Sequence, residues 1–409
     1  MSNSMSELGK KPKNIRSRNR QLIVDIYRNH DQLIVSEISD KVKLSRTTIL
    51  KINQELVEEG FIKVVGKGDS TQEGGKKPTV YRFNAEKSYI LTFYIQYDAV
   101  LFRLYDLLFK IVIEDSMPIR ENADFDDISR KMQLLISRNI RDNERYAHTD
   151  MLACVVGVHG NIDLDTGICI QATHFASWGI NNNLHQTLVD TLGLDCPIYL
   201  DNWIRLKTYR EKRQGEVGSM DSAVVIDAGW HGVASGILVK GEVFPGRHYL
   251  SGEVGHFQVN PADQEACFCG SHGCFEKQVQ IERFMKQVRE RVAESPDSLL
   301  HGKAVLSLQS VLTAADDGDS LARELLDTII EWFARLISFL LLFFDPEILL
   351  VEGDYVSGCS YFEEGIITRV RQITLPRITS KTVVKFNEDG ADAVLKGAAI
   401  MAVDKYLQI

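Results

Sequence analysis

The most informative stretch of the sequence is Gly255-His256 together with Cys267-Phe268-Cys269-Gly270-Ser271-His272-Gly273-Cys274. Three thiolates and one imidazole are the donors that a structural zinc ion takes in a closed tetrahedral site. The glycines at 270 and 273 allow the loop to fold back, so that Cys274 can reach the same ion as the other two cysteines. A closed site leaves no position for water, which excludes a hydrolytic zinc. We therefore predict a structural zinc site.

The sequence alone leaves two candidates for the fourth ligand, His256 and His272. A redox switch formed by Cys267 and Cys269 is an alternative use of the same thiols. Clustered cysteines in a cytosolic chain nevertheless favour a metal, because exposed free thiols at this density would be prone to oxidation. The remaining cysteines are scattered among apolar or turn residues and are expected to be ordinary reduced thiols: Cys154, Cys169, Cys196 and Cys359.

Length and composition predict a cytoplasmic globular protein of two or three domains. The chain has 409 residues, of which 44% are hydrophobic and 25% charged. The N-terminus is polar and lacks the apolar core of a secretory signal. The most apolar run, 332–344, is shorter than the roughly 20 residues of a membrane span and contains Arg335, so we expect a buried helix there.

Charge is distributed unevenly along the chain. Residues 1–84 contain 16 Lys and Arg against 10 Asp and Glu, a net charge of +6, and the rest of the chain has a net charge of −15. A basic head on an acidic body predicts that the head binds a polyanion. The alternatives are a basic flexible tail or a helical module that binds no nucleic acid.

The pattern within the head predicts a winged helix. Apolar residues at helical spacing predict a first helix over 14–30 and a short second helix over 36–42 with Ser36 as its cap. Ser45 is placed to cap a third helix, 46–59, which ends at Gly60. Its buried face would carry Ile49, Ile52 and Leu56, and the other face is polar.

We predict that this third helix lies in a DNA major groove and contacts base edges. The two-stranded ribbon that follows it is the predicted wing. Strands over 61–65 and 79–83 flank a glycine-rich basic tip, 66–78, suited to phosphate or minor-groove contact. Helix side chains that reach base edges and phosphates complete the interface. We predict double-stranded DNA as the partner and these contacts: Arg46, Thr47, Thr48, Lys51, Gln54, Lys67, Lys76 and Lys77.

From residue 89 the alternation of elements predicts an α/β body with mixed sheets. Expected strands cover 90–96, 100–105, 111–115, 152–158, 198–200, 223–226, 233–239 and 348–351, and expected helices cover 125–143, 183–194, 281–294 and 320–344.

The stretch Gly252-Glu253-Val254-Gly255-His256, with the cysteine loop and Phe275-Glu276 after it, resembles the signature of the ROK family of repressors, open reading frames and sugar kinases. The segment 74–78 and Lys396-Gly397-Ala398-Ala399 also fit the family. The resemblance implies a two-lobed, actin-like ATPase fold after the winged helix. It divides the chain into a head at 1–84, a first lobe at 85–205 on which 390–409 packs, and a second lobe with the zinc loop at 206–389.

The resemblance also implies a sugar cleft and selects His256 as the fourth ligand. The predicted zinc ligands are thus His256, Cys267, Cys269 and Cys274. One ring nitrogen of His256 would bind zinc and the other a sugar hydroxyl. The family pattern assigns further sugar contacts to Asn202, Glu253 and Glu276.

Three departures from the family's kinases predict that phosphoryl transfer is lost. Trp203 occupies the place of the aspartate base, and an indole cannot accept a proton from a hydroxyl. Asp201 is a poor substitute, because neighbouring side chains on an extended segment point to opposite faces. The first phosphate loop, 94–99, contains no glycine, and the second, 229–236, places Trp230 and His231 where small residues are needed.

The favoured hypothesis is therefore a repressor of carbohydrate uptake or catabolism genes, without enzymatic activity, whose body responds to a sugar. An aromatic face for the sugar ring could come from Trp178, Trp203 or Trp230. Two alternatives are an active sugar kinase with an added head, and a regulator whose body binds another protein. Because binding of a palindromic operator requires two symmetry-related heads, we predict that the protein forms a homodimer or homotetramer.

Overall fold

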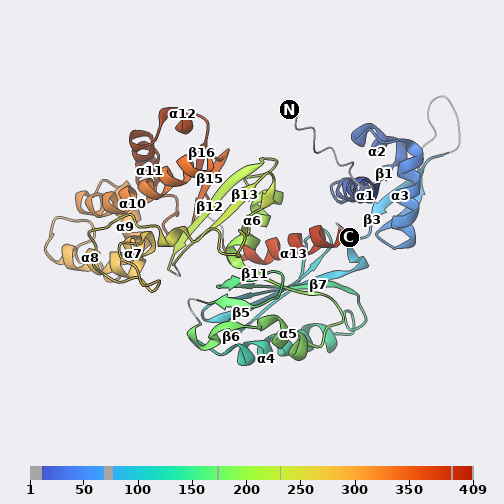
Figure 1. Ribbon diagram of the computed structural model, residues 1–409, viewed down its shortest axis with the longest axis horizontal. Helices are drawn as coiled ribbons and strands as arrows, with labels where there is room; N and C mark the ends of the chain where they lie inside the picture. Colours follow the sequence, from blue (N-terminus) through green and yellow to red (C-terminus); the bar gives the residue numbers. More distant parts are fainter. Residues whose placement is uncertain (1–11, 69–76, 173–174, 231, 388–389, 408–409) are drawn as a thin grey trace, which may run out of the picture.

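The computed structural model describes residues 12–68, 77–172, 175–230, 232–387 and 390–407. A small N-terminal head, drawn in blue in Figure 1, lies beside a larger body built around two five-stranded sheets. The 3-10 helix Ala85–Lys87 lies between them in the chain. This is the predicted class, a winged helix-turn-helix followed by a two-lobed α/β body.

The head consists of three helices and a small sheet. The helices are α1 (Pro12–Arg28), α2 (Val35–Val42) and α3 (Arg46–Glu58). The sheet has the order β1-β3-β2, with β1 at Leu33–Ile34, β2 at Ile62–Lys67 and β3 at Thr79–Phe83. The sequence predicted the helices and the β2–β3 ribbon but not β1.

The helix caps of the head confirm one prediction and correct another. The Ser45 hydroxyl accepts a hydrogen bond from the backbone N–H of Thr48 at 3.2 Å, which caps α3 as predicted. Ser36 does not cap α2, because the helix already begins at Val35. The Glu37 carboxylate instead accepts the backbone N–H of Ile34 at 2.8 Å and fixes that end of the helix.

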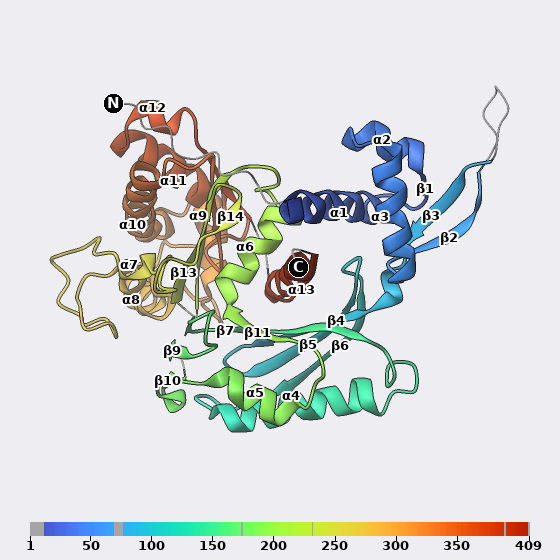
Figure 2. The same cartoon turned by 45° about the vertical axis from the view of Figure 1, so that its right-hand side comes forward.

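The first body sheet has the order β11-β7-β4-β5-β6. Its antiparallel strands are β4 (Tyr89–Ile95), β5 (Ala99–Asp106) and β6 (Ile111–Pro118), and its parallel strands are β7 (Met151–Val158) and β11 (Ile198–Asn202). Helices α4 (Phe125–Ile136) and α5 (Leu184–Leu192) cover its outer face (Figure 2). A π-helical turn, Ser137–Arg141, ends the helix predicted over 125–143.

The second body sheet repeats this plan with the order β14-β13-β12-β15-β16. Strands β12 (Ser222–Gly229), β13 (Gly232–Val239) and β14 (Glu242–Val243) are antiparallel, and β15 (Ile348–Glu352) and β16 (Val383–Phe386) are parallel to β12. The remaining helices of this lobe are α7 (Phe275–Val279), α8 (Ile281–Ala293), α9 (Leu308–Asp316), α10 (Ser320–Phe344), α11 (Ser360–Ile373) and α12 (Pro376–Thr379). A third, small sheet joins β8 (Asn161–Ile162), β9 (Cys169–Gln171) and β10 (Ile180–Asn182).

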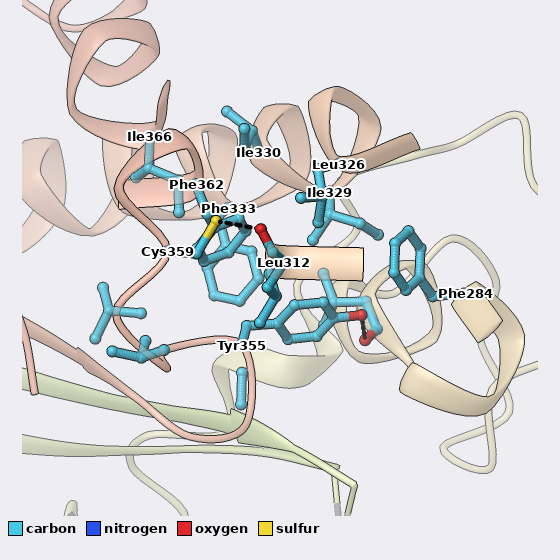
Figure 3. Close-up of a cluster of buried hydrophobic side chains, with 14 of the residues drawn as sticks. Phe284, Leu312, Leu326, Ile329, Ile330, Phe333, Tyr355, Cys359, Phe362 and Ile366 are labelled. Atoms are coloured by element: carbon cyan, nitrogen blue, oxygen red, sulfur yellow. Dashed lines mark hydrogen bonds between the residues drawn. The ribbon is translucent and has the colours of Figure 1, made fainter. Parts of the chain in front are cut away.

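An aromatic core holds the helices of the second lobe together (Figure 3). The ring of Phe333 on α10 meets those of Tyr355 and Phe362 edge-on, at centroid distances of 5.7 and 5.4 Å. The Tyr355 hydroxyl donates to the carbonyl of Val279, so its polar end is satisfied inside the core. The apolar run 332–344 thus lies in a core helix as predicted, although Phe343 at its end is 70% exposed.

Two helices lie between the sheets, α6 (Trp203–Gln214) and α13 (Ala391–Leu407) (Figure 2). Helix α13 packs on the first sheet, where Val394 and Ala398 share a core with Tyr94 and Val155. Among the described residues, no helix is long and apolar enough to cross a membrane.

Candidate functional site

The four predicted metal ligands lie together. His256 ends the 3-10 helix Val254–His256, Cys267 and Cys269 lie in the following loop, and Cys274 precedes α7. One donor atom from each lies within 4.8 Å of the others. His272 is not in this group; its backbone carbonyl accepts a hydrogen bond from Gln258.

Two of the donor–donor distances match the edges of a tetrahedral site. The Sγ atoms of Cys269 and Cys274 are 3.7 Å apart, and Cys267 Sγ is 3.6 Å from Nδ1 of His256. Zinc–sulfur bonds of about 2.3 Å and zinc–nitrogen bonds of about 2.0 Å give tetrahedral edges of about 3.5–3.8 Å. Donor chemistry and geometry are therefore consistent with a structural metal site.

Glycines make the loop possible. Gly273 has a φ of +66°, and a Cβ there would overlap the carbonyl oxygen of Asn260. Gly270 has a φ of +86°. Isolated bridges between Gln258 and Cys274 and between Ala266 and His272 then close the loop around the ligands.

A small cavity of about 60 Å³ adjoins the metal cluster. It brings together all four predicted sugar contacts, which come from both lobes. Beside them lie further groups that the sequence analysis did not single out. The lining residues are His159, Gly160, Asn161, Asn202, Trp203, Val233, Ala234, Glu253, His256, Phe268 and Glu276.

His256 links the metal cluster to the cavity. Its Nδ1 faces Cys267, while its Nε2 lies 3.9 Å from a carboxylate oxygen of Glu253. Phe268, between two metal ligands in the chain, meets the His256 ring edge-on at 4.7 Å. A metal that fixes the loop would therefore also fix two side chains of the cavity.

The cavity is acidic. Burial raises the pKa of Glu253, and hydrogen bonding from Asn161 and the charge of His256 oppose this rise. Burial also raises the pKa of Glu276, whose carboxylate accepts the backbone N–H of Val233 at 2.9 Å. No lysine or arginine is among the described residues that line the cavity.

At the end of β11, Asn202 has both a cavity-lining and a structural role. Its side-chain oxygen accepts the N–H of Ile204 and caps α6, and its amide nitrogen donates to the carbonyl of Gly160. The neighbouring Asp201 is buried and bonds to Arg205 at 2.5 Å. Asp201 does not line the cavity, as the alternation along the strand predicted.

Aromatic rings separate this cavity from a second one. Trp203 and His159 line both cavities, with ring centroids 5.1 Å apart. Of the three tryptophans considered as a sugar platform, Trp203 alone lines the small cavity. Trp178 is buried against Phe175, and Trp230 is half-exposed outside both linings.

The second cavity, of about 490 Å³, lies between the lobes where both β-hairpins end. Gln96 of the β4–β5 hairpin and Gly229 and Gly232 of the β12–β13 hairpin line it. Its charged groups include Lys207, which pairs with Asp227 at 2.5 Å. Lys207 also lies 2.8 Å from the buried Glu352.

Sequence reasoning missed Lys207 and Asn161. Lys207 lies inside a helix that was not predicted, and its partners are on β12 and β15, far away in the chain. His159 and Asn161 follow the buried strand β7, which ends at Val158, and polar residues directly after a buried strand were the available signal.

The polar face of α3 in the head is exposed as expected for a nucleic-acid interface. Arg46, Thr47, Lys51 and Gln54 are exposed, whereas Ile49, Ile52 and Leu56 on the opposite face are at most 3% exposed. The Thr48 hydroxyl is only partly exposed and contacts that of Ser45. Lys67 and Lys77 are exposed on the ribbon, and Lys76 lies outside the described residues.

A family model described as "ROK family" matches residues 109–405, most of the body and nearly three quarters of the chain. The chain belongs to the ROK family.

Similarity to ROK regulators extends over the head as well. The chain is 26% identical over 382 residues to the DNA-binding transcriptional repressor Mlc of Escherichia coli, covering 92% of this chain and 91% of Mlc. It is 22% identical over 358 residues to the xylose repressor of Caldicellulosiruptor bescii, covering 87% and 86%.

Solved ROK structures agree with the fold. A ROK family transcriptional regulator, a homologue of Escherichia coli Mlc, superposes with a TM-score of 0.80 and 22% identity over 97% of this chain and 98% of its own. A ROK glucokinase from Streptomyces griseus superposes with a TM-score of 0.60 and 20% identity over 78% of this chain and 100% of its own. Kinases therefore share the ROK fold, while the regulators match 87–97% of the chain, head included.

Proposed function

We propose that this ROK protein is a transcription regulator, a repressor of carbohydrate uptake or catabolism genes, that binds operator DNA through its head and an unphosphorylated sugar through its body. The observation that carries the proposal is the match to repressors over about nine tenths of both chains, head included. The exposed polar face of α3, on a head with net charge +6, supplies the chemistry for DNA.

The DNA contacts proposed are the predicted ones. Arg46, Thr47, Lys51 and Gln54 reach bases and phosphates from α3, and Lys67 and Lys77 reach phosphates from the ribbon. Thr48 serves mainly at the start of α3, because its hydroxyl is held by Ser45. A palindromic operator would require a homodimer or homotetramer.

We also propose the boundaries 1–84 for the head, 85–205 for the first lobe and 206–389 for the second lobe, and a cytoplasmic location for the protein.

The sugar site proposed is the small cavity, with Asn202, Glu253, His256 and Glu276 as hydroxyl partners and structural zinc on the ligands His256, Cys267, Cys269 and Cys274. When bound, zinc would hold the loop and leave Nε2 of His256 toward the cavity. Two carboxylates without a lysine or arginine among the lining residues disfavour a phosphate group. The effector is therefore an unphosphorylated sugar.

The absence of kinase activity is the third part of the proposal. Trp203 provides no base toward the cavity, and Asp201 is held by Arg205. The Lys207 ammonium, which could contact phosphate in the larger cavity, is paired with two carboxylates. Among the described residues that line this cavity, a nucleoside triphosphate would thus meet Asp227 and Asp354 and no lysine or arginine besides Lys207.

Three measurements test these parts. Fluorescence anisotropy with DNA from upstream of the protein's own gene should show salt-sensitive binding, and no preference over random DNA would overturn the repressor proposal. Thermal shifts should respond to an unphosphorylated sugar such as D-xylose or D-glucose and not to glucose 6-phosphate. A response to neither would favour control by a protein partner.

The third measurement is a coupled assay with ATP, magnesium and a panel of hexoses. Catalytic turnover would establish the sugar kinase alternative.

A further inference from the structure

Helix α6 joins the proposed sugar cavity to the DNA-binding head. Asn202 caps its first turn, and Trp203 begins it as a wall of the cavity. At its last turn, Arg213 and Gln214 line a different cavity, of about 300 Å³, where the body meets α1 of the head. Twelve helical residues span about 18 Å, so one rigid element connects the two places.

The middle of α6 is packed so that the helix cannot shift alone. A Cβ at Gly397 would overlap the carbonyl oxygen of Leu206, so α6 and α13 touch through their backbones. A Cβ at Gly236 would overlap the Thr208 hydroxyl, which brings α6 equally close to β13. Any displacement of α6 is therefore transmitted to α13 and to the second sheet.

The ends of α6 and α13 present charged groups to the head. Arg213 donates two hydrogen bonds to Asp404 of α13, at 2.7 and 3.0 Å. Asp25 of α1 lies close enough that the charge of Arg213 opposes the rise that burial causes in its pKa. Asp25, Arg213 and Asp404 line the junction cavity together with Arg28.

Arg28 fastens the head to the body. Its guanidinium lies 4.2 Å above the ring centroid of Phe109 and donates to the carbonyl of Leu107, both in the turn after β5. It also lies 3.8 Å from Asp25. These contacts are polar and directional and a cavity lies beside them, whereas head and body also share one apolar core that includes Val24, Phe109 and Ile400. A small shift of α6 and α13 can exchange the polar partners and so change how α1 sits on that shared core.

We propose that Asp25, Arg28, Arg213 and Asp404 form a latch through which α6 reports the state of the sugar cavity to the DNA-binding head. The inference rests on the proposed sugar-responsive regulator and names its route of regulation. A sugar that contacts Asn202 displaces the start of α6, and the end of α6 then changes the charged contacts that orient α1. Since α1 and α3 share buried side chains, including Ile23, Ile52 and Leu56, the orientation of α1 sets that of α3 on DNA.

The test separates binding from coupling. Affinity for upstream DNA is measured by anisotropy without and with saturating D-xylose or D-glucose, in the wild type and in Asp25→Asn and Arg213→Gln. Allosteric coupling between sites is typically about 5- to 150-fold in affinity. We expect a ratio in this range for the wild type and a ratio near unity for both variants, with sugar affinity and zinc content unchanged.

The matched control is Arg291→Gln, which removes an exposed ion pair with Glu324 in the second lobe and should keep the wild-type ratio. Wild-type coupling in both latch variants would overturn the latch while leaving the sugar-responsive regulator intact. A wild type whose DNA affinity responds to no sugar would overturn both.

A second measurement tests the latch in the wild type alone and so does not depend on whether the variants fold. Hydrogen exchange of wild-type amides, without and with sugar, should change in α1 and in the last turn of α6. Sugar-dependent exchange that stays confined to the cavity and leaves α1 unchanged would overturn the latch.

Discussion

The Lys207 ammonium lies 2.5 Å from a carboxylate oxygen of Asp227, at the wall of the larger cavity between the lobes. Lys207 is 2% exposed, and the carboxylate of Glu352, also in contact with it, is fully buried. One ammonium thus compensates two carboxylates from neighbouring strands, β12 and β15. The group ties α6 to the second sheet at the place where the resemblance to kinases implies phosphate binding.

Removing this ammonium should destabilise the body strongly. Lys207→Met leaves Asp227 and Glu352 without their cation, which should cost about 3–5 kcal/mol of unfolding free energy. Chemical denaturation followed by circular dichroism measures the change. The control is Lys385→Met, whose exposed pair with Glu216 should contribute less than about 1 kcal/mol. Equal losses in the two variants would contradict a structural role for Lys207.

Glu352 should make stability depend on pH. Burial raises its pKa to about 7, although Lys207 opposes the rise. Because the folded state holds this proton more tightly than the unfolded state, Glu352 makes the protein less stable as pH rises from about 4.5 to 7. Unfolding free energies measured over this range should show a more negative slope in the wild type than in Glu352→Gln. Comparing the two proteins removes the contribution of all other titrating groups, which are the same in both. Equal slopes of unfolding free energy against pH would contradict the prediction.

The metal should be structural. Cys274→Ser should lose bound zinc, measured by elemental analysis, and should lower the midpoint of thermal unfolding, because the loop then loses its common anchor. Sugar-induced thermal shifts should disappear with it, since His256 and Phe268 lose their positions. Cys196→Ser, outside the cluster, is the control and should keep its zinc. Full metal content in Cys274→Ser would show that this thiol is not a ligand.

The face of α3 should carry operator specificity. Gln54→Ala should weaken binding to the preferred DNA by about 1–3 kcal/mol while changing random-DNA binding little, if Gln54 contacts a base. Lys77→Ala on the ribbon should weaken binding to the preferred DNA and to random DNA alike. It should also lower the slope of log affinity against log salt concentration by about one. Lys110→Ala, exposed on the body, is the control. Unchanged affinities in both head variants would place the interface elsewhere.

Local sequence patterns were sufficient to predict many elements of this molecule. The cap of α3, the ribbon after it, the core strands and the four-residue metal cluster all depend on residues close in the chain or on a distinctive motif. Amphipathic spacing failed for α6 and α13, because both helices are enclosed between lobes and have no wholly polar face. Lys207 and Arg205 are buried within α6, whereas charged residues usually indicate an exposed segment, so their types did not indicate an enclosed helix.

The sequence by itself determined the class of the protein, because the spacing of Gly255-His256 and the cysteine loop, the three-helix head and the charge asymmetry are properties of the chain as written. The residue types left His256 and His272 open and only the family resemblance favoured His256, whereas the tertiary structure places Nδ1 of His256 3.6 Å from Cys267 Sγ once the loop closes. It also decided that Trp203 and Arg213, at opposite ends of α6, face the cleft and the head. The physical reason is that these relations join separate elements, whose positions depend on packing across the two sheets.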